Sequence, residues 1–255
     1  MDPYAWSSNP EGLVVIILCA AYTFAASTYA TARWRIACFA LAALLLLAVS
    51  VSPLHMLAMM YLLTVHLLQN VVLAEWAPLL VVLAISPALA AAISRLEPFR
   101  AVTHPLVALP VWLGNYMVWH LPWIYDTALE HPSSVLHLEH ACYFLTGVAM
   151  WWSIVHDAPH HLPAGRRAAV VFGAFVLASP IGLVLALIPN AIYDFYVHAP
   201  ERLWGFSPLE DQQVAGLLMA LEQAVVFFAV FSFWFARFFA EEERREEIDR
   251  SPEAA

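Results

Sequence analysis

The chain has 255 residues, of which 62% are hydrophobic and 12% are charged, and its mean hydropathy is +0.72. A soluble domain carries about 25% charged residues, so this composition leaves too little polar surface for a soluble protein. It predicts a membrane protein and excludes a soluble enzyme, a nucleic-acid-binding protein and a secreted disulfide scaffold. The net charge of −9 says little about the core, because much of the acidic excess lies in the run from Glu241 to Glu247.

Apolar stretches long enough for membrane-spanning helices, each of about 20 residues, occur seven times along the chain. They are predicted at 12–31, 34–51, 55–84, 104–121, 135–155, 168–189 and 211–239. The third is overlong, and Pro78 and Pro87 are expected to kink or end it because proline lacks a backbone donor. The segment from Pro87 to Arg100 is then expected to lie at the membrane interface. The predicted fold class is all-α, a polytopic membrane helix bundle of seven transmembrane helices.

Arginine placement predicts the orientation of the bundle. Arginines lie in alternate connections and after the last span: Arg33, Arg35, Arg95, Arg100, Arg166, Arg167, Arg244, Arg245 and Arg250. Basic residues are enriched in cytoplasmic loops, so we expect the N-terminus outside and the C-terminus in the cytoplasm. Residues 1–240 form a single seven-helix domain in this interpretation, and residues 241–255 form a charged cytoplasmic tail.

Histidines and carboxylates gather at the predicted outer ends of the spans. His120 ends the fourth span, and His137 and His140 open the fifth with a spacing that puts both rings on one helix face. Asp126 follows the fourth span, and Asp211 opens the seventh. Imidazole nitrogen is a ligand for copper, zinc, iron and nickel. We therefore predict a metal site at the outer leaflet, with polar anchoring of the histidines at the interface as the alternative.

A row of methionines beside one more histidine favours copper among these metals. His55 lies near the outer end of the third span, next to Met56 and Met60, which share a helix face. Thioether sulfur is a soft donor that favours Cu(I). Ordinary apolar packing of methionine is the alternative.

Polar side chains also occur deep within the spans, where they are costly and therefore candidates for function. His66 lies near the predicted midplane, followed one turn later by Gln69 and Asn70. Hydrogen bonding between helices explains such residues equally well. Glu222 lies deep in the seventh span, where it is either buried against a partner or protonated.

Several of these residues fall in runs that resemble one family. The runs are TVHLLQN at 64–70, WHLP at 119–122, HLEH at 137–140, RLWGFSPL at 202–209 and DQQ at 211–213. From about residue 50 to the tail, the chain resembles the CtaG-type cytochrome c oxidase assembly factors, which are bacterial seven-span membrane proteins.

The resemblance implies a role in assembling haem–copper oxidase, through binding or delivery of copper to the oxidase and without turnover chemistry. The implied partners are cytochrome c oxidase subunits and the lipid bilayer, with no nucleic acid, and the implied location is the bacterial inner membrane. By motif position, the functional polar residues would be His66, His120, His137, His140 and Asp211, with His55, Met56, Met60, Asp126 and Gln69 as additional candidates. Asn70 stands where the family's third span usually has a second histidine, which weakens the expected deep site.

Two other functions remain open at this point. A transporter of metal ions or protons would use His66, Gln69, Asn70 and Glu222 as its path. A haem-binding electron carrier would need two histidines facing each other at matched depth. His66 has no such partner within the spans, which leaves a haem at the outer side as the open form of this alternative. A retinal photoreceptor is excluded, because a Schiff base needs a lysine and the chain has none.

Overall fold

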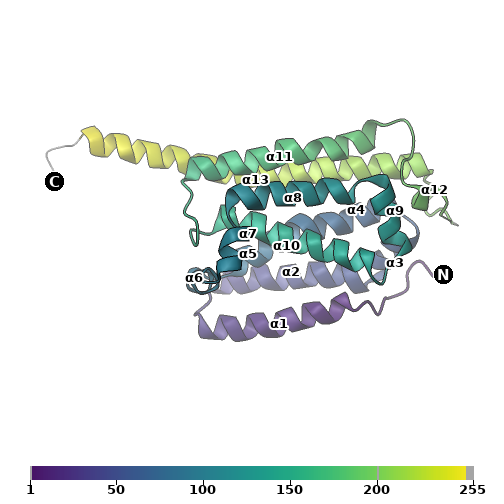
Figure 1. Cartoon of the computed structure of the whole chain (residues 1–255), viewed down its shortest axis with the longest axis horizontal. Helices are drawn as coiled ribbons and strands as arrows, with labels where there is room; N and C mark the ends of the chain where they lie inside the picture. Colours follow the sequence, from purple (N-terminus) through teal and green to yellow (C-terminus); the bar gives the residue numbers. More distant parts are fainter. Residues whose placement is uncertain (1, 200, 251–255) are drawn as a thin grey trace.

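The computed structural model describes residues 2–199 and 201–250, and within these residues the chain is helical and has no β-strand. Long antiparallel rods run side by side (Figure 1). In chain order they are α1 (Glu11–Thr28), α2 (Arg33–Val51), α4 (Leu63–Val71) continued by η1 (Val72–Trp76) and α5 (Ala77–Ala84), α8 (Pro105–Trp119), α10 (Val135–Val155), α11 (Ala164–Leu187) and α13 (Pro208–Arg250).

Short helices cover the two ends of the bundle. The end near the N-terminus, called the N-terminal end below, carries α3 (Pro53–Met60), α9 (Pro122–Glu130) and α12 (Asp194–Val197), and the opposite end carries α6 (Pro87–Ile93) and α7 (Glu97–Val102) (Figure 1). The segment predicted as interfacial therefore forms two short helices. The chain termini lie at opposite ends, as expected for an odd number of antiparallel rods.

Five rods within the described residues are long and apolar enough to cross a membrane: Glu11–Thr28, Arg33–Val51, Leu63–Ala84, Ala164–Leu187 and Pro208–Ile248. The helix α8 has 15 residues and is only about 22 Å long. The helix α10 has 21 residues, but its first turns carry His137, Glu139 and His140. Seven spans, and the orientation inferred from arginine, therefore stay predictions.

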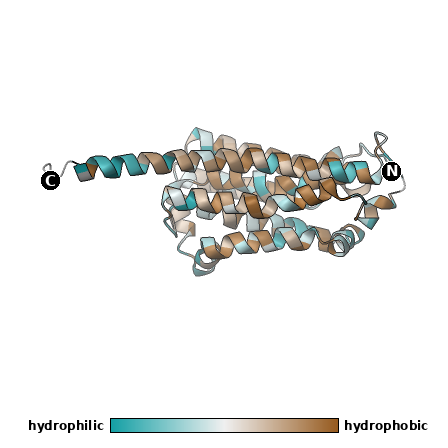
Figure 2. Cartoon of the chain, turned by 90° about the horizontal axis from the view of Figure 1, so that it is seen from above, coloured by the Kyte–Doolittle hydropathy of each residue, from teal (hydrophilic) through white to brown (hydrophobic). Residues whose placement is uncertain are grey.

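The surface of the bundle is apolar, as a lipid-facing surface must be, and the polar colouring is strongest on the free end of α13 (Figure 2). Large exposed side chains include Ile16, Phe24 and Leu44 on the first two rods. Among these five rods, burial is greatest in the central rod Leu63–Ala84, where 67% of its most apolar 18-residue stretch is buried, against 17% in α1. The polar side chains of the central rod are therefore shielded from lipid by its neighbours.

The helix predicted at 55–84 is interrupted, which corrects the expectation of one overlong span. The segment α3 ends at Met60, Leu62 is extended, and α4 begins at Leu63. The exposed amides at the start of α4 are taken by Asp211, whose carboxylate oxygens accept from Leu63 N at 2.8 Å and Thr64 N at 3.0 Å. A helix start needs such acceptors, and here the acceptor comes from α13.

Two prolines affect the course of the third rod near the expected positions. The helix α5 ends at Ala84, and Pro87 begins α6, so the predicted end at Pro87 is confirmed. Pro78 lies in the first turn of α5, directly after the π-helix η1. The wider π turn before Pro78 lets the rod continue past a residue without a backbone N–H. It also places Glu75 in the bundle interior.

The helices α11 and α13 approach closely at two glycines. A Cβ at Gly216 would lie 2.5 Å from both the backbone nitrogen of Ala186 and the carbonyl oxygen of Gly182. Backbone atoms cannot move aside as a flexible side chain can. Small residues at this crossing therefore set the distance between the two helices, as is usual in membrane bundles.

We expect Gly216→Ala to separate α11 from α13 and to lower the free energy of unfolding by about 1–3 kcal/mol. Unfolding in detergent, followed by circular dichroism, measures the change. The matched control is Gly173→Ala, also on α11, where an added Cβ meets nothing within 4 Å. Equal stability of the two variants would contradict this packing.

The charged tail begins as a continuation of α13, which extends to Arg250. Pairs one turn apart support it, with Arg245 contacting Glu242 at 2.7 Å and Arg250 contacting Glu246 at 2.7 Å. Exposed pairs of this kind contribute little stability each. The remaining tail residues, 251–255, lie outside the described residues.

Candidate metal centre

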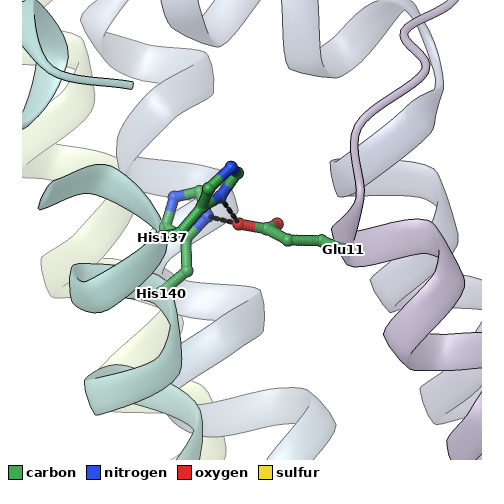
Figure 3. Close-up of side chains that lie close together, drawn as sticks. All are labelled: Glu11, His137 and His140. Atoms are coloured by element: carbon green, nitrogen blue, oxygen red, sulfur yellow. Dashed lines mark hydrogen bonds and ion pairs between the residues drawn. The ribbon is translucent and has the colours of Figure 1, made fainter. Parts of the chain in front are cut away.

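Two histidines and a glutamate meet at the N-terminal end of the bundle. His137 and His140 come from the first turns of α10, and Glu11 is the first residue of α1. The Nδ1 atoms of His137 and His140 lie 2.8 Å and 2.7 Å from the same oxygen, Glu11 Oε1. Figure 3 shows both rings turned toward this carboxylate across the space between the helices. One ligand atom from each residue lies within 4.8 Å of the others.

Local structure orients each member of this cluster. The three-residue spacing on α10 puts both imidazoles on one face. Glu11 is held from two sides, because its backbone nitrogen donates to Asn9 Oδ1 at 3.0 Å and its second oxygen, Oε2, accepts from the Ser50 hydroxyl at 3.3 Å. Side chains that fix a ligand's direction in this way sharpen metal binding.

The cluster is open on one side and closed on the other. The side chain of His140 is 3% exposed, against 18% for Glu11 and 30% for His137. The second ring nitrogen of His140, Nε2, is buried and has no hydrogen-bond partner among the described residues. An ion can therefore reach the cluster from the side of His137, while His140 holds its inner face.

An apolar cavity of about 510 Å³ adjoins the cluster. Apart from the three members of the cluster and Ser50, its walls are apolar and include Val14 and Leu18 of α1 and Phe144 of α10. This lining keeps water away from the inner side of the site. Low polarity around a site strengthens the electrostatic attraction between a bound cation and its carboxylate.

His55 lies next to the cluster on α3, outside the five candidate spans. Its ring nitrogens contact Asn9 Nδ2 at 3.4 Å and Gln69 Nε2 at 3.5 Å. Burial lowers the pKa of His55 to about 4, and the neighbouring His140 adds to this effect. His55 is therefore neutral at physiological pH, and it adds no positive charge that would repel a metal ion.

Two imidazoles and one carboxylate form a ligand set that suits zinc or copper. Three protein ligands leave further coordination positions for water or for a donor from a partner. Binding would displace the protons that the Nδ1 atoms share with Glu11, because metal-bound imidazole is neutral and deprotonated at the binding nitrogen.

The other predicted ligands do not join this cluster. His120 Nδ1 contacts the Tyr116 carbonyl oxygen at 2.8 Å, and His66 Nδ1 contacts the Tyr196 hydroxyl at 2.8 Å. We expected His120 to meet His137 and His140, but in the structure Glu11 contacts these two histidines instead. A tyrosine, and no second histidine, is the hydrogen-bond partner of His66 Nδ1, so a haem between facing histidines has no support at this position.

The two predicted aspartates act at helix starts in the structure. Asp211 caps α4, and its main-chain carbonyl and carboxylate also accept from the Thr64 hydroxyl, at 3.0 Å and 2.7 Å. Asp126 accepts from the backbone nitrogens of Asp194 and Phe195 at the start of α12, both at 3.1 Å. These hydrogen bonds account for the positions of both carboxylates without a bound metal. A role of Asp126 and Asp211 as metal ligands stays a prediction.

The remaining candidates have other surroundings. Met60 lines a separate pocket with Glu130 and His198, and Met56 is partly buried. Gln69 donates to the Val49 carbonyl oxygen at 3.0 Å, and Asn70 donates to Glu139 at 3.2 Å. The amides therefore tie helices together, which is the alternative that the sequence left open.

The family of the chain follows from comparison with known proteins. Residues 16–241 match the family model described as "Cytochrome c oxidase caa3 assembly factor (Caa3_CtaG)". The chain belongs to this family. No curated protein and no solved structure matches the chain significantly.

The caa3 assembly factor family is the one that the motifs predict, so the suspected resemblance is confirmed. The family match starts at residue 16 and includes His137 and His140, while Glu11 precedes it. Sequence reasoning missed Glu11. The only signal for it was an acidic residue at the start of the first apolar stretch, and that pattern ordinarily indicates a carboxylate placed at a helix N-terminus.

Proposed function

We propose that this caa3 assembly factor binds copper at Glu11, His137 and His140 and delivers it to a copper centre of cytochrome c oxidase. The observation that carries the proposal is the contact of two imidazole nitrogens with one carboxylate oxygen, at 2.8 Å and 2.7 Å. Among the described residues, this is the group of histidine, cysteine and acidic side chains spaced to hold a metal ion. Membership of the family indicates the oxidase as the partner, and in this proposal copper is the ion that the protein carries to it.

Release as well as binding is accommodated by this geometry. The site has no cysteine or methionine ligand, so it lacks the soft donors that hold Cu(I) most firmly. His137 is partly exposed, which leaves room for a donor from an oxidase subunit to enter before copper leaves. An exchange of ligands on the ion needs such an open position.

The location follows from the same reasoning. We place the protein in the bacterial inner membrane, with the N-terminal end of the bundle facing outward. The arginine-bearing connections support this orientation under the positive-inside rule. The copper site would then face the compartment from which copper reaches the outer copper centre of an oxidase.

Complementation tests the proposal. In a strain that lacks the protein, oxidase activity is expected to fall and to be restored by the wild-type chain. The double variant His137→Ala/His140→Ala is expected to fail at low copper and to recover when copper is added in excess. The matched control His131→Ala, an exposed histidine at the same end, is expected to restore activity fully. Full activity of the double variant at low copper would contradict copper delivery through this site.

A further inference from the structure

A pair of glutamates lies inside the bundle, away from the copper site. Glu75 comes from η1 of the central rod, and Glu222 comes from α13. At a rise of about 1.5 Å per residue, they lie about 18 Å and about 21 Å from the starts of α4 and α13. Because both helices start at the N-terminal end, the two carboxyl groups lie at matched depth within the apolar part of the bundle. Each accepts a hydrogen bond from the residue next to the other in the chain, Glu75 from Gln223 and Glu222 from Trp76, so the two side chains lie beside each other.

The partners of this pair are neutral. Gln223 Nε2 donates to Glu75 Oε1 at 2.8 Å and also contacts the Tyr116 hydroxyl at 2.9 Å. Trp76 Nε1 donates to Glu222 Oε2 at 2.8 Å. The titratable groups that face the pair are thus the two carboxyls and the phenol of Tyr116, and none of the pair's described partners carries a positive charge.

Two carboxyl oxygens are left without a donor. Glu75 Oε2 and Glu222 Oε1 are buried and have no hydrogen-bond partner among the described residues, and Gln223 Oε1 is in the same state. Glu75 itself is 0% exposed. An unpaired buried charge is expensive in an apolar medium, and two charged carboxylates in contact are more expensive still. The negative charge of the pair must therefore be neutralised, by a bound cation or by protonation of the carboxyl groups.

We propose that the Glu75–Glu222 pair is a proton-binding site that holds one exchangeable proton between its two carboxyl groups. A proton satisfies both unpaired carboxyl oxygens at once, because the protonated acid donates to the other oxygen. A metal cation fits less well, since calcium takes six to eight oxygens and magnesium six, and the pair itself offers two unpartnered oxygens. On the side of Glu75 the site is closed by buried Gln223 and Tyr116, which are joined by a hydrogen bond.

The pair is also reachable from the lipid-facing surface. A groove of about 560 Å³ on α13 is lined by apolar side chains such as Leu218 and Val225, together with Trp76 and Glu222. An apolar reagent that enters this groove meets the Glu222 carboxyl group. The site thus has an apolar approach at Glu222.

Infrared spectroscopy tests the proposal on the purified full chain at pH 8. The difference spectrum between wild type and Glu75→Gln/Glu222→Gln is expected to show the carbonyl band of one protonated carboxylic acid, which shifts in deuterium oxide. Other buried acids, such as Glu139, cancel in this difference. The matched control Glu243→Gln, an exposed acid on the same helix, is expected to give no such band. Absence of the band from wild type minus double variant would overturn the proposal.

Carbodiimide labelling of the wild type decides the matter if circular dichroism shows that the double variant does not fold. The acid O–H adds across one C=N bond of dicyclohexylcarbodiimide, the proton going to nitrogen and the carboxyl oxygen to carbon. The product rearranges to an N-acylurea without loss of any group. Peptide mapping at pH 8 is expected to find the reagent's mass on Glu222 and none on Glu243. No label on either Glu75 or Glu222 would overturn the proposal. Neither test involves copper, so each stands apart from the proposed function.

Discussion

Replacement of His140 by alanine is expected to abolish stoichiometric copper binding and to lower the affinity at least about 100-fold. Loss of a residue that merely orients a ligand costs about 10–100-fold, and His140 supplies a ligand atom itself. It is also the most buried member of the cluster, with a side chain 3% exposed. Metal analysis of the purified variant, together with titration against a copper chelator, measures both quantities.

A graded series sharpens this test. His137→Ala is expected to weaken binding in the same direction, and Glu11→Gln to weaken it by removing the negative charge that balances the ion. The matched control is His131→Ala, which removes an exposed histidine from the same end of the bundle. Unchanged copper content in both His137→Ala and His140→Ala would show that copper does not bind at these residues.

Asp211→Ala is expected to lower the free energy of unfolding by about 3–5 kcal/mol, which is at the low end of the sum because bonds made by one group are not fully additive. The carboxylate accepts from two backbone amides of α4 and from the Thr64 hydroxyl, and hydrogen bonds to a charged group are worth about 1.5–3 kcal/mol each. The loss leaves buried amides unpaired at a helix start. Asp211→Asn, which keeps one carbonyl acceptor, is expected to lose about half as much. Denaturant titration in detergent, followed by tryptophan fluorescence, measures the change.

The Asp211→Ala variant also distinguishes two roles for this carboxylate, which are capping of α4 and binding of the metal ion. If it only caps α4, folded Asp211→Ala protein is expected to bind copper with wild-type stoichiometry. A control for general effects of charge removal is Asp194→Asn, an exposed acid at the same end. Loss of copper with unchanged stability would instead show that the carboxylate is a metal ligand and would contradict the cap as its main role.

Features that depend on neighbouring residues were predictable from the sequence. The start of α13 is an example, because Ser207, Pro208 and Glu210 form a typical helix start. In the structure Ser207 N donates to Glu210 Oε2 at 2.8 Å, and Glu210 N donates to Ser207 Oγ at 3.3 Å. The pairing of His137 with His140 is equally local, since both lie on one helix face.

Features that depend on distant residues were not predictable in this way. The break before Leu63 is stabilised by Asp211, which lies far away in the chain and meets α4 only after folding. Glu11 likewise becomes a candidate ligand only because two histidines of another helix contact it in the folded chain. Glu75 fell inside the predicted span 55–84, and nothing in the sequence indicated that it would lie beside Glu222.

X-ray absorption spectroscopy at the copper edge tests the central claim most directly. The purified full chain loaded with one copper ion is predicted to give two imidazole nitrogens at about 2.0 Å from copper and an oxygen ligand, with no sulfur. The imidazole signal is predicted to fall in His140→Ala. A copper ion coordinated by methionine sulfur, or an imidazole signal unchanged in His137→Ala/His140→Ala, would contradict the account.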